Sequence, residues 1–338
     1  MLIYFRGITI LKEYYHKAKI LAQKLKQAKK VAIIGHPSPD PDIIGSMFAL
    51  ARGLKSRDLP QPALYLLDPF DLMDLFEEDS LPVVGKPDPS PVDILFILDI
   101  GSYKRALENG EIVTNAKFVV NIDHHLDNDG FGDIALVDYD ASSTGELVYM
   151  LLKGLGVELD KQIARSLYIA IMTDTGGFKY PNTKSRTAAI LSELLKFDFN
   201  FTEIYREFYD LQSFAQLKLR SRIIDRIESK FDGLVAESFF EEKDLSDLKL
   251  RECEAGNLIY DLTNIRGVSL AILYRKLNNE KVKVSFRANK NFDVKSLANI
   301  LGGGGHKKAS GATFKGNFYL ARDMVDNYIK KNLSTLVS

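Results

Sequence analysis

The sequence has almost no cysteine, with Cys253 as its single example among 338 residues. One cysteine cannot form an intramolecular disulfide, so a disulfide-stabilised fold is excluded and a reducing compartment is favoured. No run approaches the roughly 18 apolar residues of a membrane span. The apolar stretch 1–5 is too short for the core of a signal peptide and ends at Arg6. We therefore expect a soluble, cytoplasmic protein with no membrane partner.

An excess of charge of either sign is also absent, because Lys+Arg and Asp+Glu each number 45. Proteins that bind duplex DNA carry a basic surplus, so the balance argues against duplex DNA as a partner. The charge balance does not exclude the binding of short nucleic acids by a local basic patch. Hydrophobic residues at 46% and charged residues at 27% are ordinary for a globular protein. The length favours two domains, each with its own core.

Short apolar runs alternate with helical patterns over residues 1–197. Expected strands lie at 31–35, 63–67, 92–100 and 118–122. Residues 68–91 are rich in Asp, Glu and Pro and are expected to be irregular, with one or two short helical turns. An amphipathic helix is expected at 8–30, with its lysines on a solvated face. This alternation predicts an α/β fold with a doubly wound, mostly parallel sheet.

The pattern changes after residue 197. Residues 198–216 are Phe/Tyr-rich and helical, and we interpret them as a linker to a second domain at 217–338. Strand candidates at 234–240, 268–274 and 282–287 alternate there with helices. The second domain is therefore expected to be smaller and of mixed α+β type.

Acidic and imidazole side chains follow the apolar runs of the first domain. They lie in the loop after 31–35, at the end of 92–100, directly after 118–122, and at the end of a helical pattern over 161–173. The residues are His36, Asp40, Asp42, Asp99, Asp123, His124, His125 and Asp174. A single His or Asp at such a position is more often structural. Because the carboxyl ends of parallel strands meet at one edge of a sheet, four such segments together indicate a site.

Carboxylates with a minority of imidazoles and no thiolate suit a hard or borderline divalent ion, Mn²⁺ before Zn²⁺. Six or so donors exceed a single tetrahedral site. They fit two ions ~3.5–4 Å apart that share one carboxylate, as in metal-assisted hydrolysis of phosphate esters.

The second domain contains a glycine run, Leu301-Gly-Gly-Gly-Gly-His-Lys-Lys-Ala-Ser-Gly311. Glycine lets backbone N–H groups approach an anion, and neighbouring cations add charge. We expect Gly303, Gly304, Gly305 and His306 to bind a substrate phosphate with Arg287, which follows the strand candidate. A flexible loop is an equally good interpretation of the glycines alone. Similarly, Ser143 and Glu146 are spaced as a helix-starting capping box, with phosphate contact as the less favoured interpretation.

Taken together, the loop HPSPDPD at 36–42, the Asp-His-His triplet at 123–125 and the glycine run at 302–306 resemble the DHH/DHHA1 phosphoesterase family. Its members include nanoRNases that also act on pAp, cyclic-dinucleotide phosphodiesterases and the single-strand exonuclease RecJ. The motifs stand in the family's order and cover the chain from residue 31 onward. The resemblance implies two Mn²⁺ ions, with Mg²⁺ or Co²⁺ as substitutes, in a cleft between two domains.

The resemblance also implies a role for each residue. One ion would be held by His36, Asp40 and Asp99, and the other by Asp42, Asp99, His124 and Asp174, with Asp99 bridging. His125 would contact the scissile phosphate, and Asp123 would orient the imidazoles. Arg287, the glycine run and His306 would bind the other end of the substrate. One position departs from the family pattern: Pro41 stands where glycine is usual, so we expect a stiffer loop or altered metal geometry.

The leading functional hypothesis is a Mn²⁺-dependent phosphodiesterase or exonuclease. It would hydrolyse short single-stranded oligoribonucleotides (nanoRNA) or linear dinucleotides such as pApA to 5′-mononucleotides, and would extend to pAp. Length and neutral charge favour this compact group over RecJ. A cyclic-di-AMP phosphodiesterase is the first alternative function. The sequence does not determine whether the protein forms a homodimer.

Two further alternatives are weaker. An inorganic pyrophosphatase or polyphosphatase shares the DHH half, but the glycine run argues against that branch. A non-catalytic nucleotide-binding regulator would be expected to lack metal ligands, and the complete ligand set argues against it.

Overall fold

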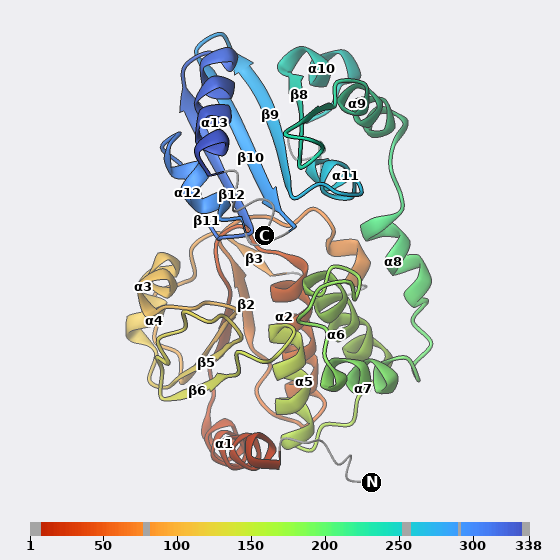
Figure 1. The fold of residues 1–338 in the computed structure, drawn as a ribbon. Coiled ribbons are helices and arrows are strands. Elements are labelled where there is room, and N and C mark those ends of the chain that lie inside the picture. Colours follow the sequence, from red (N-terminus) through yellow and green to blue (C-terminus); the bar gives the residue numbers. More distant parts are fainter. Residues whose placement is uncertain (1–7, 77–81, 252–257, 290–291, 333–338) are drawn as a thin grey trace. The chain divides into compact units, whose positions relative to one another are not determined.

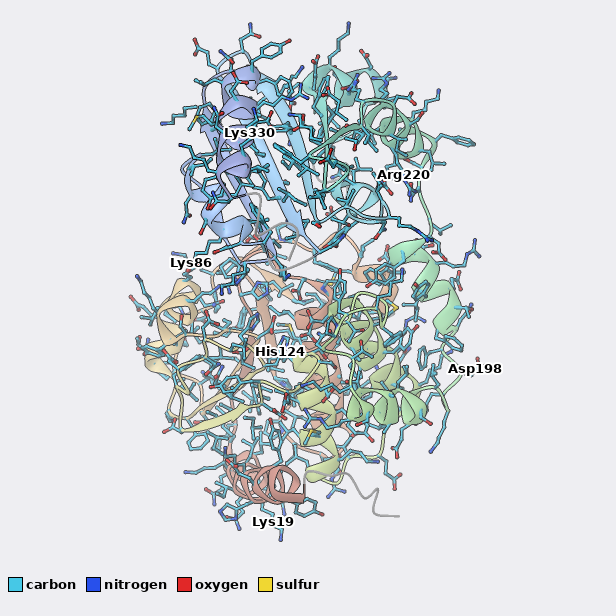
Figure 2. The ribbon with its side chains drawn as sticks, viewed as in Figure 1. Lys19, Lys86, His124, Asp198, Arg220 and Lys330 are labelled. Carbon is cyan, nitrogen blue, oxygen red and sulfur yellow. The ribbon has the colours of Figure 1, made fainter. Side chains whose placement is uncertain are left out.

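The computed structural model describes residues 8–76, 82–251, 258–289 and 292–332. The chain forms two compact units, Met1–Leu211 and Gln212–Ser338, which are traced in Figure 1. Figure 2 adds the side chains, with His124 in the first unit and Lys330 in the second. None of the helices in the described ranges has both the length and the apolar character needed to cross a membrane.

A six-stranded parallel sheet forms the centre of the first unit. In spatial order its strands are β3 (Val83–Val84), β2 (Ala63–Leu66), β1 (Val31–Ile34), β4 (Ile94–Leu98), β5 (Val119–Asp123) and β6 (Ile134–Val137). The order reverses between β1 and β4, and the crevice at such a switch point is where open α/β sheets bind ligands. The predicted doubly wound α/β fold is confirmed.

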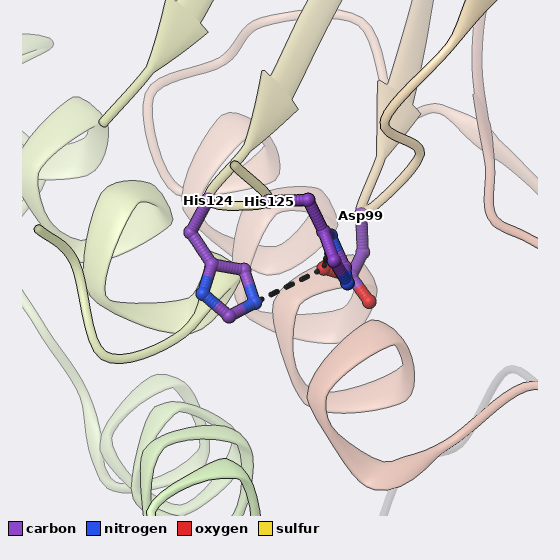
Figure 3. Close-up of side chains that lie close together, drawn as sticks. All are labelled: Asp99, His124 and His125. Atoms are coloured by element: carbon purple, nitrogen blue, oxygen red, sulfur yellow. Dashed lines mark ion pairs between the residues drawn. The ribbon is translucent and has the colours of Figure 1, made fainter. Parts of the chain in front are cut away.

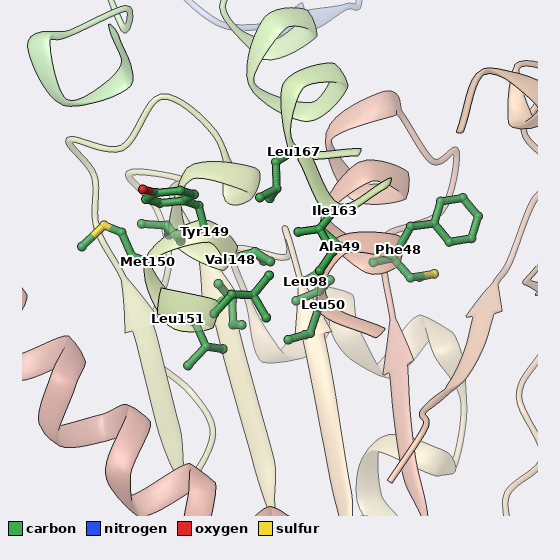
Figure 4. Packing of buried hydrophobic residues seen from close by; sticks show 14 of the residues in the cluster. Phe48, Ala49, Leu50, Leu98, Val148, Tyr149, Met150, Leu151, Ile163 and Leu167 are labelled. Carbon is green, nitrogen blue, oxygen red and sulfur yellow. The ribbon is translucent and has the colours of Figure 1, made fainter. Parts of the chain in front are cut away.

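Helices cover both faces of this sheet. One face carries α1 (Ile8–Gln27), α2 (Pro41–Lys55), α5 (Thr144–Gly154), α6 (Lys161–Asp174), α7 (Ser185–Leu194) and α8 (Phe201–Tyr209). The other carries α3 (Tyr103–Ala106), the 3₁₀ turn η2 (Leu107–Asn109) and α4 (Ile112–Asn115). Alternate side chains of β4 enter the two cores, Phe96 on the first face and Ile97 on the second, which explains the continuous apolar run. Figure 4 shows Leu98 of β4 among residues of α2, α5 and α6.

Some elements differ from the expectation. Residues 68–91, expected to be irregular with one or two short helical turns, contain the 3₁₀ turn η1 (Met73–Phe76) and also the short strand β3, which was not expected. β6 was not predicted at all, because four apolar residues carry little periodicity. Within the predicted linker 198–216, α8 buries Ile204 in the core of the first unit.

The second unit contains a mixed six-stranded sheet. Its strands, in spatial order, are β11 (Gly304–Gly305), β12 (Ala309–Lys315), β10 (Lys281–Ala288), β9 (Leu270–Asn278), β8 (Val235–Glu241) and β7 (Glu228–Lys230). Strands β8 and β9 are parallel, and the other pairs are antiparallel. Helices α9 (Phe214–Asp225), α10 (Glu242–Leu248) and α11 (Ile259–Thr263) cover one face, and α12 (Val294–Asn299) and α13 (Phe318–Lys331) the other. The mixed α+β expectation is confirmed, although β7, β11 and β12 were not predicted.

The packing of α2 on α6 depends on Gly45. A Cβ atom at this position would lie 2.3 Å from the backbone oxygen of Ser166, which cannot move without shifting α6. A Cβ at Gly53 of the same helix would instead meet a side-chain methyl of Leu152, at 2.4 Å. The two glycines therefore differ in what an added methyl group displaces: rigid backbone or a flexible side chain.

We expect Gly45→Ala to lower the free energy of unfolding by about 1–3 kcal/mol, since overpacking against backbone outweighs the gain in helix propensity. Gly53→Ala is the matched control and should cost less, because Leu152 can change rotamer. Urea unfolding of both variants measures the difference. Equal stabilities for the two would contradict this account of the α2–α6 contact.

Candidate active site

The first group of polar side chains lies between β1 and α2. His36 is buried after β1, and Asp40 is the N-cap of α2, where its Oδ1 accepts from the Ile43 N–H at 3.0 Å. Pro41 occupies the first helical position, which suits its fixed φ and needs no N–H partner. Asp42 was expected in the loop, but it lies in the first turn of α2. Pro41 therefore starts the helix that carries Asp42.

Asp99 follows β4 with a left-handed backbone (φ 58°) and is 3% exposed. Its two carboxylate oxygens face different partners. Oδ2 lies 3.5 Å from His36 Nε2, and Oδ1 lies 3.5 Å from both His124 Nε2 and His125 Nδ1. This one carboxylate thus contacts imidazoles from two different loops.

His124 and His125 follow β5, whose last residue is Asp123. Figure 3 shows both rings beside Asp99. The fully buried Asp123 Oδ1 lies 2.7 Å from His125 Nδ1, so it fixes the orientation of His125 in particular. The side chain of His125 remains 41% exposed.

Asp174 comes from the end of a helix and not from a strand, because α6 extends through this residue. Its Oδ2 lies 3.5 Å from His124 Nε2, and Asp42 Oδ2 lies 4.0 Å from the same nitrogen. The side-chain amide of Asn182 donates to the Asp174 carbonyl at 3.1 Å and holds the end of the helix. A helix terminus therefore completes a site that is otherwise built mainly from strand ends.

Three sets of nitrogen and oxygen atoms lie close enough to hold cations, with the donor atoms of each set within 4.8 Å of one another. The sets are His36, Asp40 and Asp99; Asp42, His124 and Asp174; and Asp99, His124 and His125. Hard divalent ions lie roughly 2.0–2.6 Å from their ligand oxygens, so a cation fits between atoms at the observed separations. The residues present fit a pair of divalent cations that share Asp99.

The imidazoles are surrounded by negative charge. Burial alone would lower the pKa of His36, but hydrogen bonds to Asp40 and Asp99 outweigh it and raise that pKa to about 10. Burial likewise opposes protonation of His124, yet Asp99 and its acidic neighbours raise the pKa to about 10. The hydrogen bond to Asp123 raises the pKa of His125. All three rings are therefore in surroundings that favour positive charge.

The carboxylates divide into two kinds. Burial and the neighbouring Asp99 raise the pKa of Asp42, and burial raises the pKa of Asp174 to about 6. Burial also disfavours ionisation of Asp99, but hydrogen bonds from His124 and His36 hold its pKa well below the usual range. Protons on the imidazoles balance this buried negative charge, and a divalent cation would supply the same compensation.

The helix start at Ser143 was predicted, but its contacts with the acidic side chains of the site were not. The backbone N–H groups of Thr144 and Gly145 donate to Asp42 Oδ2 and Oδ1 at 2.8 and 2.9 Å, and the Thr144 hydroxyl donates to Asp99 Oδ1 at 2.9 Å. Ser143 caps the helix as predicted, but the Glu146 side chain bonds to Ser142 instead of closing the capping box. A helix N-terminus favours nearby negative charge, and this was the one signal that could have suggested acidic neighbours for the predicted helix start.

Asn128 was also missed. Its buried amide donates to Asp123 Oδ2 at 2.6 Å and to Asn121 Oδ1 at 2.9 Å, while its own oxygen accepts from the Gly130 N–H. Asn128 therefore fixes Asp123, which in turn fixes His125. Its position in the sequence, three residues after His125, does not by itself indicate these hydrogen bonds.

In the second unit, the residues predicted to bind phosphate gather on adjacent strands. Arg287 of β10 pairs in register with Ala309 of β12, next to the turn that carries His306. The Arg287 side chain is half-buried, and its Cζ lies 5.8 Å from the centre of the Tyr260 ring. Its Nε is buried without a hydrogen bond to the described residues.

The glycine run is not a free loop in the part of the chain that is described. Gly304 and Gly305 form β11, which pairs with β12. The tight turn between these strands is closed by the His306 N–H, which donates to the Ala309 carbonyl at 2.8 Å. A Cβ at Gly303 would lie 2.2 Å from the Gly311 oxygen, so the run requires glycine for close packing. His306, Lys307 and Lys308 are exposed at the turn.

Family models match both units: the DHH family N-terminal domain over residues 30–171 and the DHHA1 domain over 234–331. The chain is 31% identical over 307 residues to the bifunctional oligoribonuclease and PAP phosphatase NrnA of Thermus thermophilus, covering 90% of each protein. It is 30% identical to the Bacillus subtilis protein of the same name, covering 82% of this chain and 87% of that one. An exopolyphosphatase-related protein from Bacteroides fragilis has a similar structure, with TM-score 0.86, 25% identity, and 96% and 98% coverage.

The parallel sheet with a His/Asp cluster at its carboxyl edge, joined to a mixed-sheet unit, defines a metal-dependent phosphoesterase. The chain belongs to the DHH/DHHA1 phosphoesterase family.

We expect Asn128→Ala to reduce turnover by about 10–100-fold, because loss of the residue that orients a site side chain usually has an effect of this size. Asn115→Ala is a matched control, since its amide donates to the Pro89 carbonyl at 2.8 Å in an exposed position. Steady-state kinetics of both variants would test the prediction. A decrease that is equal in the two would remove the role assigned to Asn128.

Proposed function

We propose that this phosphoesterase is a Mn²⁺-dependent phosphodiesterase that hydrolyses short oligoribonucleotides, or linear dinucleotides such as pApA, to 5′-mononucleotides. Its activity extends to the phosphate of pAp. Cyclic di-AMP is the alternative substrate within the same chemistry. Inorganic pyrophosphate or polyphosphate ranks below it, and a purely regulatory nucleotide-binding role ranks last.

The observation that carries the proposal is the position of Asp99. A buried carboxylate with one oxygen toward His36 and the other toward His124 can serve two cations at once. Asp40 stands beside the first imidazole, and Asp42 and Asp174 beside the second. If this cluster had only a structural role, four acidic groups and three imidazoles would lie together at one edge of the sheet. Only the protons bound to these groups would then balance the negative charge.

The assigned groups would hold two cations, His36, Asp40 and Asp99 on one side and Asp42, Asp99, His124 and Asp174 on the other. Two such ions lower the pKa of a bridging water and neutralise phosphate oxygens during in-line attack. Mn²⁺ suits this mixed oxygen and nitrogen donor set, with Mg²⁺ and Co²⁺ as substitutes.

His125 is the side chain placed to contact the substrate. Asp123 holds its Nδ1 at 2.7 Å and favours the positively charged ring, while the side chain is 41% exposed. A charged imidazolium donates a strong hydrogen bond to an anionic phosphate oxygen. We assign His125 to the scissile phosphate, with Asp123 as the residue that orients it.

The second unit would bind the end of the substrate that does not react. The exposed turn at His306, with Gly303, Gly304 and Gly305 before it, and the guanidinium of Arg287 offer hydrogen-bond donors and positive charge on neighbouring strands. A second anionic group, separated from the reacting phosphate, distinguishes pAp or a 5′-phosphorylated dinucleotide from a simple phosphate ester. This favours substrates with at least two phosphates or a phosphate and a nucleoside.

The relatives support the same substrate class, because two proteins matched over most of their length are named oligoribonuclease and PAP phosphatase. The equal numbers of acidic and basic residues agree, since long single strands are usually bound along extended basic grooves.

A Mn²⁺-supplemented substrate panel tests the proposal directly. It comprises pApA, a short oligoribonucleotide, a long single-stranded RNA, pAp, cyclic di-AMP and inorganic pyrophosphate, with the products resolved by chromatography. We expect kcat/KM to be highest for the dinucleotide and the short oligomer, with 5′-mononucleotides as products. Preference for the long strand, or release of orthophosphate from pyrophosphate without nucleotide turnover, would overturn the proposal.

Asp99→Ala should reduce hydrolysis of pApA by about 10³-fold or more, because loss of the shared carboxylate removes several kcal/mol of transition-state stabilisation. Asp93→Ala is the control at the opposite end of β4, where Asp93 accepts from the backbone of Lys29 and pairs with Lys117. Initial rates under saturating Mn²⁺ measure the effect. Unchanged turnover in Asp99→Ala would exclude the two-metal mechanism.

A further inference from the structure

Thr144 contacts one carboxylate from each of the two candidate cation groups. Its backbone N–H donates to Asp42 Oδ2 at 2.8 Å, and its hydroxyl donates to Asp99 Oδ1 at 2.9 Å. Asp42 belongs to the group with His124 and Asp174, while Asp99 also belongs to the group with His36. One fully buried residue thus connects the two groups.

The position of Thr144 is itself closely constrained. It is the first residue of α5, and the preceding Ser143 caps the helix by accepting from the Glu146 N–H at 3.1 Å. The next residue, Gly145, packs so tightly that a Cβ would lie 2.6 Å from Ala170 Cβ of α6 and 3.3 Å from Asp42 Oδ1. The start of α5 cannot shift without disturbing both α6 and Asp42.

The two hydrogen bonds of Thr144 restrict the carboxylates in complementary ways. A carboxylate oxygen has two lone pairs, so the hydroxyl occupies one at Asp99 Oδ1 and leaves the other for a ligand on the imidazole side. The backbone N–H groups of Thr144 and Gly145 together fix both oxygens of Asp42. Thr144 is thus hydrogen-bonded to both carboxylates and links their positions.

We propose that Thr144 is a positioning residue that sets the separation of the two cations by holding Asp42 and Asp99 in fixed orientations. This inference rests on the two-cation site of the proposed function and does not depend on which substrate is hydrolysed. The hydroxyl is the part that can be removed experimentally, because the backbone contact to Asp42 survives substitution of the side chain.

Three substitutions separate the hydroxyl from general packing. Thr144→Val keeps the branched shape and removes the donor to Asp99, whereas Thr144→Ser keeps the donor and removes a methyl group. Thr187→Val is a matched control, because Thr187 is also buried and its hydroxyl donates to a different buried carboxylate, Glu146 Oε2, at the same distance of 2.9 Å. Urea unfolding in the presence of a chelator shows whether each variant is folded before cations are added.

The measurement is a Mn²⁺ titration of the full chain, followed by calorimetry and by electron paramagnetic resonance, with no substrate present. In the unsubstituted protein and in Thr144→Ser and Thr187→Val, we expect two bound ions with a spin-coupled signal. In Thr144→Val we expect the weaker ion to bind about 10–100-fold less tightly, with the coupled signal reduced or changed at equal occupancy.

Several outcomes would overturn the inference. A Thr144→Val protein with unchanged affinity and an unchanged coupled signal would show that the hydroxyl does not set the separation. A similar loss in Thr187→Val would assign the effect to packing, and failure of Thr144→Ser to restore the signal would exclude the hydrogen bond as its cause. Binding of one ion only by the unsubstituted protein would also reject it. Failure of the substrate proposal alone would leave the Mn²⁺ titration unchanged.

Discussion

The site depends on a single buried carboxylate placed between two imidazoles. Asp99 emerges from a strand whose side chains enter both cores, and its left-handed backbone turns the carboxylate toward the loops after β1 and β5. Such a group is expensive to bury unless its charge is compensated on both oxygens. The imidazoles of His36 and His124 provide that compensation, and cations would provide it more strongly. The loops after β1 and β5 meet this need for compensation, because they bring His36 and His124 to the two oxygens of Asp99.

Much of the site was predictable because strand-end chemistry is local in sequence. His36, Asp99, His124 and His125 each follow an apolar run directly, and in a parallel sheet all such positions meet at one edge. The place of Asp42 in a helix and not a loop was not predicted, because Pro41 could be interpreted as either stiffening a loop or starting a helix. The structure resolves this ambiguity through the N-cap formed by Asp40.

What the sequence could not reveal are contacts made by residues distant in the chain. Thr144 lies 102 positions from Asp42 and 45 positions from Asp99, and its own surroundings indicate only a helix start. Asn128 and Asn182 are similar, since a side-chain amide gives no signal until its acceptors are placed. The missed strands β6 and β12 have the same cause, because each is recognised by its pairing with neighbouring strands and not by its own periodicity.

The glycine run shows how one pattern can support two opposite interpretations. Consecutive glycines are typical both of flexible linkers and of segments where backbones approach closely. Here Gly303 and Gly305 lie where any Cβ would clash with β12, so this run forms an ordered hairpin with exposed cationic side chains at its turn. An ordered hairpin loses little conformational entropy when an anion binds, unlike a loop that must first be immobilised. If the second unit binds a substrate phosphate as proposed, the binding would come from the exposed side chains of this ordered turn, with no need for a high overall positive charge.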